Sequence, residues 1–81
     1  MIKTKSKILS QRKILRALLK QLRTNAQLTQ TDLARKLKQP QSFVSKYESG
    51  ERRLDLIELR NICKALGIPL LSFVKRFDES I

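Results

Sequence analysis

Residues that start and stop helices divide this chain into short segments, and this punctuation constrains the fold most strongly. Between the breaks, apolar residues recur at helical spacing, and no segment shows the alternation of a strand. Pro40 and Pro69 can open a helix but not continue one, and Gly50 and Gly67 are typical of helix ends. Helices this short are unstable alone, so the pattern predicts one all-α domain of packed helices.

Capping signals place the helices within this domain. They are Ser10, Thr29 with Asp32 three residues later, and Asp55 with Glu58 in the same spacing. Together with the prolines and glycines they predict five helices within residues 8–77, the second over about 30–37 and the third over about 40–49. Residues 1–7 form a predicted basic arm, and residues 78–81 a short tail.

The charge predicts an anionic partner. Lys and Arg total 18 against 7 Asp and Glu, for a net charge of +11, and the first acidic residue is Asp32. Such a surplus points to nucleic acid or an anionic membrane surface. The absence of His, a single cysteine at position 63 and the lack of a Gly-rich phosphate loop argue against a metal, a cofactor and an enzyme. Cys63 is expected to be a core residue, and no apolar run approaches 18 residues.

The predicted helix of residues 40–49 has two chemically distinct faces. At about 100° per residue, Val44, Tyr47 and Phe43 share an apolar side. The opposite arc holds side chains that can hydrogen-bond to base edges: Gln41, Ser42, Ser45 and Lys46. Such a face also occurs on ordinary surface helices. The two short helices joined by a tight turn have the plan of a helix-turn-helix.

The pieces L-T-Q at 28–30, Q-S-x-V-S-K-Y-E-x-G at 41–50 and A-L-G at 65–67 closely resemble the Cro/repressor-type regulators of the XRE family. This resemblance implies a five-helix, lambda-repressor-like DNA-binding domain whose third helix is the recognition helix. It implies base reading by Gln41, Ser42 and Lys46. It further implies contacts to the DNA backbone from Gln30, which can also brace Gln41, and from Ser45, Ser49, Arg52 and Arg53.

The resemblance also implies structural roles and shows departures. Arg23 and Glu48 match a pair that forms a salt bridge between the first and third helices. Lys38 stands where the family usually has Gly in the turn, so we expect a strained or looser turn. Pro40 replaces the usual Ser or Thr cap, and Phe43 is expected to pack against the second helix rather than contact a thymine methyl group.

The last helix carries more apolar residues than one buried stripe needs: Leu70, Leu71, Phe73, Val74 and Phe77. Family members often dimerise through this end, and a two-fold dimer would bury an exposed patch.

The function predicted from these features is a bacterial or phage transcriptional regulator. It would act in the cytoplasm, on the nucleoid, and bind a palindromic operator on double-stranded DNA as a homodimer, most simply as a repressor. Alternatives are an antitoxin that docks a partner toxin and represses its own operon, and a restriction-modification controller. A further rival is non-specific binding to RNA or a membrane through the basic arm.

Overall fold

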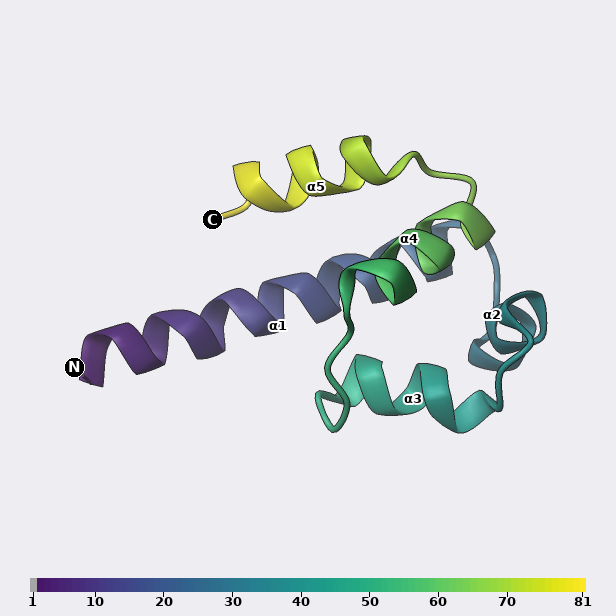
Figure 1. Cartoon of the computed structure of the whole chain (residues 1–81), viewed down its shortest axis with the longest axis horizontal. Helices are drawn as coiled ribbons and strands as arrows, with labels where there is room; N and C mark the ends of the chain where they lie inside the picture. The colour runs from purple at the N-terminus through teal and green to yellow at the C-terminus, as the bar shows by residue number, and fades with distance from the viewer. Residues whose placement is uncertain (1) are drawn as a thin grey trace.

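The computed structural model describes residues 2–81, which form five α-helices and no strand. In chain order the helices are α1 (Ile2–Asn25), α2 (Gln30–Leu37), α3 (Gln41–Ser49), α4 (Leu56–Ala65) and α5 (Leu70–Glu79). Figure 1 shows the long helix α1 in the middle of the molecule, with α5 along one side and α3 along the other. The all-α fold, the five helices and the bounds of the second helix agree with the sequence prediction.

The first helix begins earlier than predicted. Residues 2–7 were expected to form an arm, but they continue α1 to Ile2, and Ser10 therefore lies inside the helix instead of capping it. Met1 lies outside the described residues. The physical reason is that this stretch contains no Gly or Pro and is rich in Lys and Ile, which a helix tolerates well. In Figure 1 the N-terminal part of α1 projects beyond the other helices.

Two reciprocal capping boxes fix the starts of α2 and α4. The Thr29 hydroxyl accepts from the Asp32 N–H (3.0 Å), and the Asp32 carboxylate accepts from the Thr29 N–H (2.9 Å). Asp55 and Glu58 make the same exchange at α4. The Thr29 N–H holds the pKa of Asp32 below its ordinary value. Both boxes are set by residues three apart, so the sequence alone predicts them.

The turn between α2 and α3 is tight despite its lack of glycine. Lys38 adopts the left-handed conformation (φ 56°, ψ 42°), and its N–H bonds to the carbonyls of Ala34 and Arg35. A non-Gly residue there costs roughly 1 kcal/mol of strain. Pro40 precedes α3 with extended backbone and no side-chain cap, and Gly50 ends α3 at φ 92°. The turn therefore keeps its geometry, and the cost is paid as strain at Lys38.

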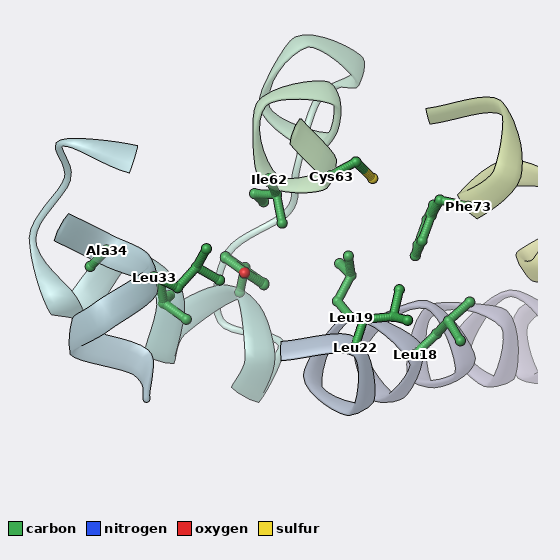
Figure 2. Close-up of a cluster of buried hydrophobic side chains, with 10 residues drawn as sticks. Leu18, Leu19, Leu22, Leu33, Ala34, Ile62, Cys63 and Phe73 are labelled. Atoms are coloured by element: carbon green, nitrogen blue, oxygen red, sulfur yellow. The ribbon is translucent and has the colours of Figure 1, made fainter. Parts of the chain in front are cut away.

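All five helices contribute to one hydrophobic core. Its most buried members are Leu19 of α1, Leu33 of α2, Val44 and Tyr47 of α3, Ile62 and Cys63 of α4, and Phe73 of α5. Figure 2 shows Leu19, Ile62 and Phe73 pointing into the same interior space from three helices. Cys63 is fully buried, as expected, and burial raises the pKa of its thiol.

The last helix runs to Glu79, two residues into the predicted tail.

Candidate nucleic-acid interface

The third helix presents a polar face to solvent and an apolar face to the core. Val44 and Tyr47 are fully buried, whereas Gln41, Ser42 and Lys46 are exposed. Phe43 is half-buried and meets the Tyr47 ring edge-on, with centroids 5.5 Å apart. Phe43 also packs against the core cluster, so its ring faces the protein interior. The three side chains assigned to base reading therefore lie together on an accessible surface.

A chain of hydrogen bonds links this surface to the interior. Gln41 Nε2 donates to Gln30 Oε1 (2.7 Å), and Gln30 Nε2 donates to Glu48 Oε1 (3.0 Å). Glu48 in turn accepts from Arg23 Nε (2.7 Å) and Nη2 (3.0 Å). Residues of α1, α2 and α3 are thus connected in one line that ends at the exposed Gln41. This arrangement limits the rotation of the Gln41 amide.

The Arg23–Glu48 ion pair anchors this line. The two side chains are only 9% and 4% exposed, and Arg23 Nη1 also donates to the Leu28 carbonyl at 2.7 Å. The hydrogen bond to Glu48 raises the pKa of Arg23 above its ordinary value. Because the pair is bidentate and nearly dry, it holds the ends of α1 and α3 in a fixed relation. The salt bridge expected from the resemblance is present in the structure.

Two of the serines of α3, Ser45 and Ser49, are held by hydrogen bonds to their own helix. Ser45 Oγ donates to the Ser42 carbonyl (3.3 Å), and Ser49 Oγ donates to the Lys46 carbonyl (3.1 Å). Each hydroxyl keeps its acceptor lone pairs. A phosphate oxygen needs a donor, so either serine would have to rotate away from its carbonyl to contact DNA backbone.

The two arginines after α3 differ in what they touch. The Arg52 guanidinium pairs with the Glu58 carboxylate (2.5 Å), donates to the Arg53 carbonyl (2.9 Å) and lies 4.8 Å from the centre of the Phe43 ring. Arg52 therefore ties the loop to both α3 and α4. The Arg53 side chain is exposed and takes part in none of the ion pairs or side-chain hydrogen bonds found between residues 2 and 81. Sequence spacing alone could not separate them.

An arginine of α1 joins this end of α3, and the sequence analysis did not assign it. A Cβ placed on Gly50 would lie 2.9 Å from Arg16 Cζ, so the guanidinium packs directly on the glycine backbone. Glycine is therefore required at position 50 for two reasons: its positive φ, and the close approach of the Arg16 guanidinium. The only signal in the sequence was the pairing of Arg12 and Arg16 four residues apart, which places them on one face of a helix.

The five residues proposed as dimer contacts do not form one exposed patch. Phe73 is 1% exposed because it fills the domain's own core, and Leu70 and Phe77 are half-buried against that core. Leu71 (83%) and Val74 (43%) remain exposed. These two lie three residues apart, on one side of α5.

Two classes of site find no support in the described chain. None of the helices within residues 2–81 is long and apolar enough to cross a membrane. The same residues contain no group of three or more His, Cys, Asp or Glu side chains placed to hold a metal ion.

Comparison with known proteins agrees with the helix-turn-helix arrangement of α2 and α3. A family described as helix-turn-helix matches residues 19–73. Among solved structures, an XRE-family like protein from Pseudomonas syringae pv. tomato is 36% identical, with 99% of this chain and 98% of that chain covered and a TM-score of 0.91. The restriction-modification controller protein C.Esp1396I is 25% identical over 85% of this chain and 91% of its own, with a TM-score of 0.78.

The clp gene regulator ClgR from Corynebacterium glutamicum shares the fold at 24% identity and a TM-score of 0.75, with 86% of this chain and 74% of that chain covered. No curated protein sequence gave a significant match.

Proposed function

Because the chain belongs to the XRE family of helix-turn-helix DNA-binding transcriptional regulators, we propose that it represses transcription by binding a palindromic operator as a homodimer. Binding would occlude a promoter on cytoplasmic, nucleoid DNA. The net charge of +11 favours association with DNA through release of counterions from the phosphates.

The observation that carries this proposal is the bracing of Gln41. One amide hydrogen of Gln41 is used by Gln30, which leaves its second N–H and its carbonyl oxygen for a base. These two groups match N7 and N6 of adenine, and a good bidentate contact is worth about 1–3 kcal/mol of discrimination. Because Gln30 and Glu48 fix the amide before binding, less conformational freedom is lost on the DNA.

Contacts to the backbone would set the register of α3 in the major groove. The start of α2 supports such a contact, because the N–H groups of its first two residues, Gln30 and Thr31, lie before the capping bond to Asp32 and have no partner within the helix, which favours an anion. Gln30 is the first residue of α2, near the start of α3, and Arg53 lies beyond the C-terminal end of α3. The two positions would hold phosphates on either side of the recognition helix, with Ser42 and Lys46 between them.

Dimerisation is supported by the exposed apolar side of α5. A two-fold axis beside Leu71 and Val74 would remove both side chains from water, and each would meet the same surface of the second copy. The two recognition helices would then reach half-sites about 34 Å, or 10–10.5 bp, apart.

A more specific role as a restriction-modification controller is favoured by the likeness to C.Esp1396I. That role would place the operator at the genes of a restriction-modification system. It differs from general repression in its target, and the DNA-binding geometry is the same.

The test is a selection from random duplex DNA at near-physiological salt with the full chain, with Gln41→Ala selected in parallel. We expect a palindrome with half-sites one helical turn apart, and loss of preference at one base pair per half-site in the variant. Enrichment of no sequence would refute the operator proposal and would direct the search to a protein partner. A motif left unchanged by Gln41→Ala would refute the role of that residue.

A further inference from the structure

A cavity of about 250 Å³ lies between α1 and the loop that connects α3 to α4. Its cationic lining comes from Arg12 and Arg16 of α1 and from the loop residue Arg53. Its apolar walls include Leu15, Leu54 and the buried Tyr47. Arg52 also borders the cavity, but its guanidinium is held by Glu58 and Phe43. Three guanidinium-bearing side chains therefore surround one hollow, and no acidic residue lines it.

These three charges have no acidic partner in the described part of the chain. The ion pairs found there engage Arg23 and Arg52. The first helix contains no Asp or Glu, because Asp32 is the first acidic residue of the sequence. Like charges that converge beside apolar walls repel each other more than they would in bulk water. An anion placed among them would reverse the sign of this interaction.

Arg16 is the best fixed of the three. It is half-buried, and its guanidinium lies against Gly50, at the carboxyl end of α3. The partial negative charge of a helix end favours a cation there. Even so, no hydrogen bond from Arg16 to a carbonyl of α3 occurs among the described residues, so its N–H groups are available to a ligand.

We propose that this cavity binds a phosphate group, with Arg12, Arg16 and Arg53 as donors. Guanidinium groups match phosphate oxygens in paired, charge-assisted hydrogen bonds. The apolar walls lower the local dielectric and strengthen these bonds, and they leave room for the carbon group that a phosphate ester carries. The phosphate comes either from the DNA backbone beside the half-site or from a small phosphate ester. Only the first source rests on the proposed function.

The binding of phosphate itself is tested without DNA. The full chain, labelled with ¹⁵N, is titrated with inorganic phosphate at constant ionic strength while the arginine Nε–Hε signals are followed by NMR. We expect saturable shifts at Arg12, Arg16 and Arg53, with Arg60 of α4 unaffected. Arg16→Gln should weaken the phosphate affinity at least tenfold, whereas the matched control Arg60→Gln, which removes the same charge, should not change it.

A parallel measurement with duplex DNA identifies the source. If the site takes a DNA phosphate, Arg16→Gln should reduce the slope of log K against log[salt] by up to about 0.9, the contribution of one phosphate contact, and Arg60→Gln should leave it unchanged. If it takes a small ester, inorganic phosphate should saturate the site while Arg16→Gln leaves the DNA slope intact. Arg12→Gln gives the same readout should Arg16→Gln fail to fold, which circular dichroism will show.

The proposal would be overturned if phosphate caused shifts of equal size at Arg60. It would also be overturned if phosphate did not saturate the site and the DNA slope stayed unchanged in both Arg16→Gln and Arg12→Gln. A failed operator selection with an intact phosphate titration would refute the proposed function and leave this site in place.

Discussion

The side-chain amide of Gln41 donates to the side-chain oxygen of Gln30 at 2.7 Å, across the turn between α2 and α3. The first residue of each helix is thereby joined to the other, although the two are eleven positions apart in the chain. The exposed Gln41, which is proposed to read a base, is consequently oriented by a residue at the start of the helix before it.

This bracing predicts coupling between the two glutamines in DNA binding. Gln30→Ala should lower operator affinity and relax preference at the base pair that Gln41 reads, because the Gln41 amide can then rotate. A double-mutant cycle of Gln30→Ala and Gln41→Ala, measured by fluorescence anisotropy on the selected operator, should give a coupling energy of about 0.5–1 kcal/mol. Strictly additive losses would show that Gln30 acts on the DNA alone.

The buried ion pair predicts a large and non-additive effect on stability. Replacing Arg23 by Met leaves the Glu48 carboxylate buried without its cation, which should cost about 3 kcal/mol in the free energy of unfolding. Arg23→Met combined with Glu48→Leu should cost less than the sum of the single changes. Urea unfolding followed by circular dichroism measures the stability of the two single variants and the double variant. A loss in the double variant equal to the sum of the two single losses would argue against a coupled pair.

The hydroxyl of Tyr47 predicts a change in stability that depends on pH. It is buried without a hydrogen-bond partner in the described chain, and burial raises the pKa of Tyr47. Tyr47→Phe should therefore stabilise the protein by about 1 kcal/mol at pH 7. In the unfolded chain the phenol ionises near pH 10. Because the folded state resists this ionisation, the native protein should lose stability as pH rises above about 10, through the raised pKa.

The Phe variant lacks this ionisation, so its advantage should widen above pH 10. Chemical unfolding of both proteins between pH 7 and 11 gives the comparison, because the two chains differ in no other titratable group. An advantage that is constant or shrinks with pH would contradict the inference.

Arg52 and Arg53 should separate in the salt dependence of DNA binding. Arg53→Gln should reduce the slope of log K against log[salt] by up to about 0.9, the contribution of one phosphate contact. Arg52→Gln should leave the slope nearly unchanged. It should instead lower the stability by about 1 kcal/mol, because the partly exposed contacts with Glu58 and Phe43 are lost. Each variant serves as the charge-matched control of the other.

The exposed side of α5 should govern self-association. Leu71→Glu places a charge on the surface proposed for the dimer, so it should shift the protein to monomer in sedimentation equilibrium and weaken operator binding. Ser72→Glu adds the same charge to the adjacent exposed position, about 100° around the helix, and should change neither. A wild-type protein that is monomeric both alone and on DNA would rule out the dimer.

The sequence by itself determined those features that depend on residues within one helical turn of each other. Both capping boxes, the bounds of α2 and the polar face of α3 follow from side-chain chemistry at spacings of three and four, which any helix of this sequence would share. The predicted start of α1 was wrong, although it too depends on neighbouring residues. The Lys and Ile residues before position 8 are compatible with a helix, but their positive charge led to their interpretation as an arm.

The tertiary structure alone decided where the long cationic and apolar side chains end. Arg52 points to Glu58 and Phe43, Arg16 reaches Gly50, and Phe73 fills the core in place of a dimer surface. Flexible arginine side chains can take many directions, and only contacts between separate helices select one of them. The packing of the five helices therefore distinguishes an arginine held inside the protein from one available to a phosphate.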